Sequence, residues 1–161
     1  MMAVQMAQTA RKQGEHPRIK TLAASIISDQ NREIAEMTGI AKQLGAKSDP
    51  MPKGGHTAMG GNMMGDARTL GIPMDEMGMS MKMDSLDGAK PFDPAFVDMM
   101  IPHHQGAVRM ARAELAKGKN VKLRSLARRI IAAQDREIRE MNQWRKKWYG
   151  AVSPAGGVPS A

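Results

Sequence analysis

Two adjacent histidines carry the clearest chemical signal in this sequence, because each imidazole follows a thioether at a spacing of four residues. At about 100° per residue, His103 shares one side of a helix with Met99 and Met110. His104 shares the adjacent side with Met100. Imidazole and thioether ligands together suit Cu(I), and imidazoles alone suit Cu(II). The pattern predicts a copper site on an internal helix face; the alternative is two hydrogen-bonded histidines, one inside and one at the surface.

A second group of polar residues lies on the next predicted helix. Gln134, Glu137 and Met141 stand at positions i, i+3 and i+7 along an apolar stripe. Buried polar groups cost free energy unless they are paired, so we expect Gln134 and Glu137 to orient an imidazole of the preceding helix. The alternative places Glu137 at the edge of the stripe, paired with Arg136 or Lys146 in solvent. The same triplet occurs earlier in the chain as Gln30, Glu33 and Met37.

A methionine-rich insert separates the two copies of this triplet. Residues 45–91 show no hydrophobic period, and glycine and proline are frequent among them, so we expect residues 50–85 to be poorly ordered or to cross the bundle surface. Four methionines alternate within it and predict a separate soft-metal cluster; the alternative is a low-complexity linker. These methionines are Met77, Met79, Met81 and Met83.

The helices that must position these groups are encoded by an internal sequence repeat. Residues 1–37 and 105–141 align without a gap and share 15 identities in 37 positions. Apolar spacings of three and four residues predict a helical hairpin in each copy, related by a pseudo-two-fold axis. The first copy begins too late to contain a counterpart of the His103–His104 pair, so we expect a truncated or misassigned start and a further pair upstream. One core is expected to join Ile26, Ile27, Ile34, Ile130, Ile131 and Ile138.

The predicted fold is all-α: a four-helix bundle built from the two duplicated hairpins. We expect one bundle domain over residues 1–149, with repeat 1 at 1–44, the insert at 45–91, repeat 2 at 92–149, and a flexible tail at 150–161. Hydrophobic residues make up 42% of the chain and aromatic residues only 3%, which favours helix packing over sheet packing. The chain contains no run of 18 apolar residues, so no membrane-spanning helix is predicted. It also contains no cysteine.

Positive charge is concentrated in the second repeat. Residues 118–149 hold ten Lys or Arg against three Asp or Glu, a net charge of +7, within a chain of +8. A basic interaction module for nucleic acid or an acidic partner is one alternative. The solvated face of an amphipathic helix is the simpler interpretation, and the lack of stacking aromatics argues against nucleic acid. No catalytic pattern is present, so we expect no enzyme; a purely structural bundle, or a homo-oligomer, is the other alternative.

The run Phe92–Ala107, which reads FDPAFVDMMIPHHQGA, and the later Gln134, Glu137-Ile138 and Met141 resemble the domain of unknown function 305 family. The resemblance implies a ferritin-like four-helix bundle of bacterial periplasmic or secreted proteins, some of which bind copper. It assigns a metal role to His103, His104 and the nearby methionines. The first copy departs from the family pattern because it lacks the histidine pair. The predicted function is copper or silver binding for extracytoplasmic sequestration or resistance, with Cu(I) favoured.

Overall fold

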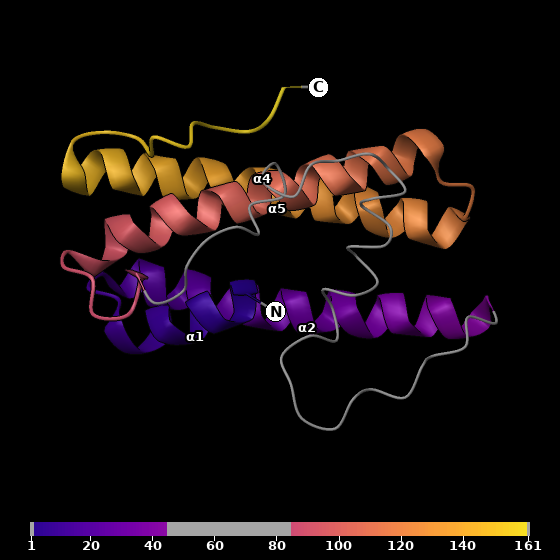
Figure 1. The fold of residues 1–161 in the computed structure, drawn as a ribbon, viewed down its shortest axis with the longest axis horizontal. Coiled ribbons are helices and arrows are strands. Elements are labelled where there is room, and N and C mark those ends of the chain that lie inside the picture. Colours follow the sequence, from indigo (N-terminus) through magenta and orange to yellow (C-terminus); the bar gives the residue numbers. More distant parts are fainter. Residues whose placement is uncertain (1, 45–84, 161) are drawn as a thin grey trace.

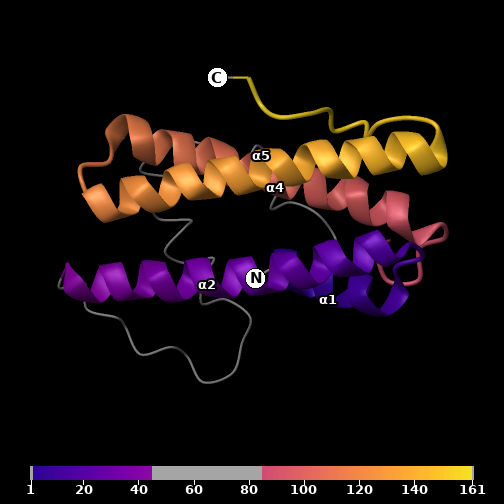
Figure 2. The same ribbon diagram turned by 180° about the vertical axis from the view of Figure 1, so that it is seen from behind.

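The computed structural model describes residues 2–44 and 85–160, and within them it contains four α-helices and no strand. α1 (Met2–Gln13) and α2 (Pro17–Gln43) form one hairpin, and α4 (Phe92–Lys117) and α5 (Val121–Tyr149) form the other. Figures 1 and 2 show the two hairpins lying one over the other as two layers. The predicted all-α four-helix bundle is confirmed. Over these same residues, no helix is long and apolar enough to cross a membrane.

Each hairpin turns at the same position of the repeat. Gly14 ends α1 by donating its N–H to the Ala10 carbonyl at 2.9 Å, and Gly118 ends α4 by donating to the Glu114 carbonyl at 2.7 Å. A Cβ atom at either glycine would lie 2.6 Å from that same carbonyl oxygen. The turn therefore requires a residue without a Cβ atom, which explains why both copies hold glycine here. Asn120 then begins α5 by accepting from the backbone N–H groups of two first-turn residues.

The core lies where α1, α2, α4 and α5 approach each other. It is built from aliphatic side chains, two phenylalanines and three methionines, all essentially shielded from water. Its methionines come from three different helices, which matches the use of Met as an adaptable filler between packed helices. The largest fully buried side chains in this cluster are Phe96, Met6, Ile19, Ile26, Leu86, Met100, Ile101, Ile138 and Met141.

The expected core of six isoleucines is only partly correct. Ile26 and Ile138 lie in the core and Ile27 packs at its edge, but Ile34, Ile130 and Ile131 are only half-buried. The cause is helix length. At about 1.5 Å per residue, the 12-residue α1 can flank less than half of the 27-residue α2. Figure 1 shows the rest of α2 extending beyond α1, so these residues meet fewer neighbours in the described structure.

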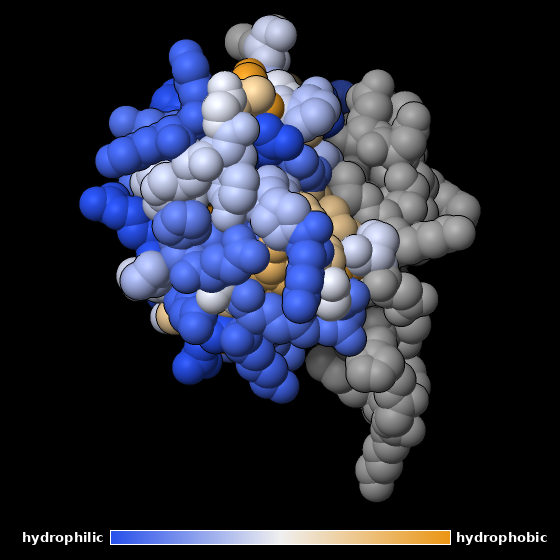
Figure 3. All heavy atoms as spheres, turned by 90° about the vertical axis from the view of Figure 1, so that its left-hand side faces the viewer, coloured by the Kyte–Doolittle hydropathy of each residue, from blue (hydrophilic) through white to orange (hydrophobic). Residues whose placement is uncertain are grey.

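The two hairpins are joined tightly at the end where α2 and α4 begin. The buried carboxylate of Asp93 accepts hydrogen bonds from the backbone N–H groups of Glu15 and His16, at 2.8 and 2.9 Å, and lies 2.7 Å from His16 Nδ1. His16 stacks on Trp148 with ring centroids 3.8 Å apart. The Tyr149 hydroxyl donates to Glu15 at 2.8 Å. Figure 3 looks at this end and shows a largely hydrophilic surface with small hydrophobic areas.

Two expected boundaries change. The insert predicted at 45–91 contributes Leu86, which is fully buried in the core, because residues 85–91 already lead into α4. The tail predicted to be flexible is instead held against the bundle. Ser153 is only 2% exposed, and Ala155 and Val158 pack against the core. The methionine cluster predicted at 77–83 lies outside the described residues.

Candidate metal centre

α4 and α5 bring His104 and Glu137 together inside the bundle. His104 Nε2 lies 2.6 Å from Glu137 Oε2, and the two side chains are 0% and 5% exposed. A carboxylate can only accept, so Nε2 carries a hydrogen, and in a neutral ring the Nδ1 lone pair is then left free. The expected partner of Glu137, an imidazole of the preceding helix, is therefore confirmed. The alternative pairing with Arg136 or Lys146 in solvent is wrong.

His103 lies beside this pair and is half-buried. Burial, followed by the neighbouring His104, lowers its pKa from 6.5 to about 4, so its imidazole is neutral near pH 7. The Nδ1 atoms of both histidines are buried and have no hydrogen-bond partner. A buried polar atom without a partner costs about 1–3 kcal/mol. Neutral imidazole nitrogens are also the form that binds metal ions, so the two unpaired atoms fit metal ligands.

The predicted thioether ligands separate into two groups. Met100 and Met141 are fully buried in the core. Met99 packs at the edge of the core, with its sulfur 3.8 Å from Ser85 Oγ. Met99 and Met100 precede the two histidines by one helical turn. Met110 is half-buried and follows His103 by seven residues, about 10 Å along the helix, so the fold does not place it in the same turn as the histidines.

Gln134 and Glu33 complete the polar surroundings. Gln134 is 4% exposed, and its Oε1 atom is buried without a hydrogen-bond partner. Glu33 comes from α2 in the other hairpin. Burial raises its pKa to about 7, with further contributions from the charges of Asp29 and Glu137. Glu33 occupies the position equivalent to Glu137 in the repeat, and that equivalence was the only sign in the sequence that the two would lie near each other.

Replacing Glu33 with glutamine should stabilise the metal-free protein above pH 7 and leave it unchanged below about pH 4.5. The folded state holds the Glu33 proton up to about pH 7, whereas the unfolded chain releases it near 4.5. Between these values the unfolded state binds fewer protons, so stability falls as pH rises. Urea unfolding at pH 4.5 and 8 measures the difference.

Glu36→Gln is the matched control for this prediction. A hydrogen bond from Arg129 lowers the pKa of Glu36, so its contribution is present above the unfolded pKa and is lost as pH falls. This substitution should slightly destabilise the protein at pH 8 and have no effect in acid. The Glu33 prediction is wrong if both variants respond to pH in the same direction.

The number of strong ligands in the bundle is small. Among residues 2–44 and 85–160, no group of three or more His, Cys, Asp and Glu side chains is placed to hold a metal ion. Any metal ion bound here would therefore rely on the two imidazoles and on thioethers, a ligand set that suits soft ions.

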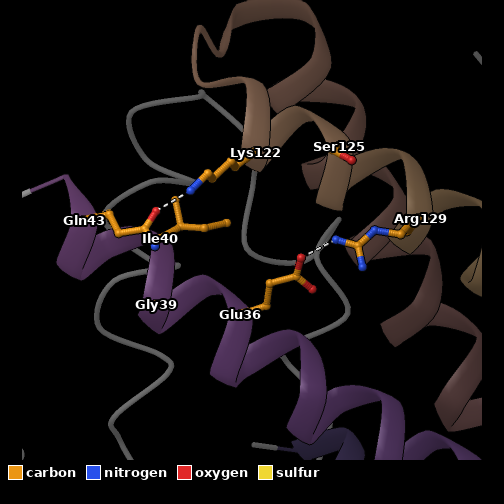
Figure 4. A pocket seen from close by; sticks show the side chains of 7 residues that line it. All are labelled: Glu36, Gly39, Ile40, Gln43, Lys122, Ser125 and Arg129. Atoms are coloured by element: carbon orange, nitrogen blue, oxygen red, sulfur yellow. Dashed lines mark hydrogen bonds and ion pairs between the residues drawn. The ribbon is translucent and has the colours of Figure 1, made fainter.

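An open cleft lies between the last turns of α2 and the first turns of α5. Figure 4 shows Glu36 and Arg129 facing each other across it, and Lys122 donating to the side-chain oxygen of Gln43 at 2.5 Å. Its lining contains neither imidazole nor thioether, so it is not the metal centre.

The basic side chains of α5 form an exposed face, as expected for an amphipathic helix. Six cations of this helix are exposed to solvent, and Arg129 pairs with Glu36 of α2. These cations are Arg128, Arg129, Arg136, Arg139, Lys146 and Lys147.

Solved structures of a metal-bound protein are similar to this chain. The chain matches CopM in the Cu(II)-bound form with a TM-score of 0.71 and 36% sequence identity, over 92% of this chain and 88% of that chain. CopM in the Cu(I)-bound form gives 0.69 and 34%, with the same coverage. CopM in the Ag-bound form, obtained by co-crystallization, gives 0.70 and 34%, again over 92% and 88%. The family model described as a domain of unknown function (DUF305) matches residues 1–156. No curated protein sequence matches significantly.

Proposed function

This chain belongs to the DUF305 family, and from its buried histidine pair we propose that it binds copper or silver ions and catalyses no reaction. The observation that carries this proposal is the His104–Glu137 hydrogen bond of 2.6 Å beside His103, with the Nδ1 atoms of both histidines buried and unpaired. A carboxylate that fixes one ring nitrogen leaves the other directed at a ligand, as is common for metal-binding histidines.

The proposed ligands are the Nδ1 atoms of His103 and His104, with thioethers from Met99 and Met100 one turn earlier. Met141 reaches the same core from α5, while Glu137 orients the His104 imidazole. Soft thioethers favour Cu(I) and Ag(I) over hard divalent ions, and only the imidazoles would hold Cu(II) appreciably. Cu(I) is therefore the preferred ion in this proposal.

The similarity to CopM supports this choice of ions. Structures of CopM hold Cu(I), Cu(II) and Ag, and the likeness extends over 92% of this chain at 34–36% identity. We extend the proposal to sequestration or resistance outside the cytoplasm, in the periplasm or in secreted form, on the basis of the family resemblance in the sequence.

The exposed cations of α5 favour one second candidate, a basic module that docks on nucleic acid or an acidic partner. Two titrations separate the candidates. Under reducing conditions, the purified protein should take Cu(I) from a weak chromophoric chelator and should not bind duplex DNA at 150 mM salt. Salt-dependent DNA binding without copper uptake would reverse the assignment.

Replacing the four alternating methionines of the insert with leucine should lower the Cu(I) stoichiometry and leave the fold intact. Leucine keeps the apolar volume but removes the thioether ligand. The substitutions are Met77→Leu, Met79→Leu, Met81→Leu and Met83→Leu. Metal analysis gives the stoichiometry and circular dichroism reports the helices; an unchanged stoichiometry would remove this second cluster from the proposal.

A further inference from the structure

The tail of the chain is bound by the residue that follows His104. Gln105 is 9% exposed, and its Nε2 atom donates to the carbonyl oxygens of Ala155 and Gly157, at 2.8 and 2.7 Å. Both hydrogens of this amide are thus used on the tail. We call residues 153–160 the C-terminal strap; in Figure 1 it crosses the side of the α4–α5 hairpin that faces away from α1 and α2.

Three further side chains bind the tail from α4 and α5. Asn142 accepts from the Ser153 N–H at 2.8 Å and donates to the Gly156 carbonyl at 2.6 Å. Arg112 donates to the last two carbonyls of the strap. Arg145 donates to the two carbonyls that precede it. Every one of these bonds ends on tail backbone, so the recognising chemistry belongs to the helices.

The anchor set is confined to the second repeat. At the equivalent positions, 104 residues earlier, the chain has Met1, Gln8, Thr38 and Ala41. The duplication therefore kept Gln, Glu and Met at equivalent positions in both copies but carries the strap anchors in only one. That copy is also the one with the histidine pair.

The anchors lie directly beside the candidate metal centre. Gln105 follows His104, and Asn142 follows Met141, so each of these two neighbouring pairs has one residue directed at the core and one directed at the strap. On the strap side, Val158 packs against the core cluster that contains Met141. The strap is therefore held by residues that are adjacent in sequence to His104 and Met141.

We propose that Gln105 is a positioning residue: by holding the backbone of the C-terminal strap, it fixes the direction of the His104 ring and keeps water from the His104–Glu137 pair. The effect on metal binding rests on the function proposed above. The effect on His104 itself does not, because it is a property of the metal-free protein.

Two full-length variants test this inference. Gln105→Met keeps the side-chain length but removes both donors, and Val158→Asp places a charge where the strap packs on the core. Val152→Asp is the matched control, because Val152 is 49% exposed and precedes the strap. Solvent exchange of the His104 ring N–H, followed by NMR on metal-free protein, and the rate of Cu(I) loss to a chelator are measured for each.

Both strap variants should speed ring exchange and Cu(I) loss by about tenfold, with unchanged stoichiometry, since outer partners of ligands typically contribute 10–100-fold. Val152→Asp should match the wild type. Wild-type ring exchange in Gln105→Met would overturn the inference, and this variant decides alone if Val158→Asp does not fold. Faster ring exchange with an unchanged rate of Cu(I) loss would overturn the proposed effect of the strap on metal binding. If the wild type binds no copper, the proposed function fails, and ring exchange still decides the role of the strap.

Discussion

Replacing His103 and His104 together with glutamine should abolish Cu(II) binding by the bundle and weaken its Cu(I) binding by more than about 100-fold. Loss of an outer partner alone typically costs 10–100-fold, and this change removes both imidazole ligands. Glutamine keeps a polar side chain of moderate size, so the helices should persist. The nitrogen-coupled Cu(II) signal in electron paramagnetic resonance should be lost, and competition with a chromophoric chelator measures the Cu(I) affinity.

His16→Gln is the control for this prediction. His16 binds Asp93 and stacks on Trp148 at one end of the bundle, so its loss should lower stability without changing the copper signal. A Cu(II) spectrum that is lost in His16→Gln and retained in the double variant would place the copper site at the His16 end of the bundle and contradict the proposal.

Replacing Glu137 with alanine should destabilise the metal-free protein by about 2–3 kcal/mol. The change leaves Nε2 of the fully buried His104 without its acceptor, and an unsatisfied buried donor costs about 1–3 kcal/mol. The loss of packed side-chain atoms adds a cavity cost. Urea unfolding followed by circular dichroism measures the change, which should appear as a lower midpoint with the same slope.

Glu140→Ala, one turn further along α5 and only half-buried, should change the unfolding free energy by less than about 0.5 kcal/mol, as is usual away from the core. Glu137→Gln should fall between the two, because its amide oxygen can still accept from His104. Equal changes in the unfolding free energy at positions 137 and 140 would show that the His104–Glu137 hydrogen bond does not add to the stability of the fold.

The helices and their pairing could be predicted from the sequence because the signals involved are local. Apolar residues at spacings of three and four specify a buried helix face wherever the chain lies. Gly14 and Gly118 mark the two turns because a Cβ there would collide with a carbonyl of the helix's own last turn. The pairing of Glu137 with an imidazole was also predictable, since a polar residue inside an apolar stripe needs a partner.

Tertiary packing decided which side chains are buried and which partners they meet outside their own helix. Ile34 and Ile138 occupy the same position of the repeat, yet Ile138 is fully buried and Ile34 is not, because burial depends on which neighbouring helix reaches that level. Only the fold shows that His104 rather than His103 meets Glu137. The binding of the strap by Gln105 was also invisible in the sequence, because it uses tail carbonyls that every residue carries. The sequence by itself determined the faces of the helices and the candidate ligands; packing alone decided which of those groups meet.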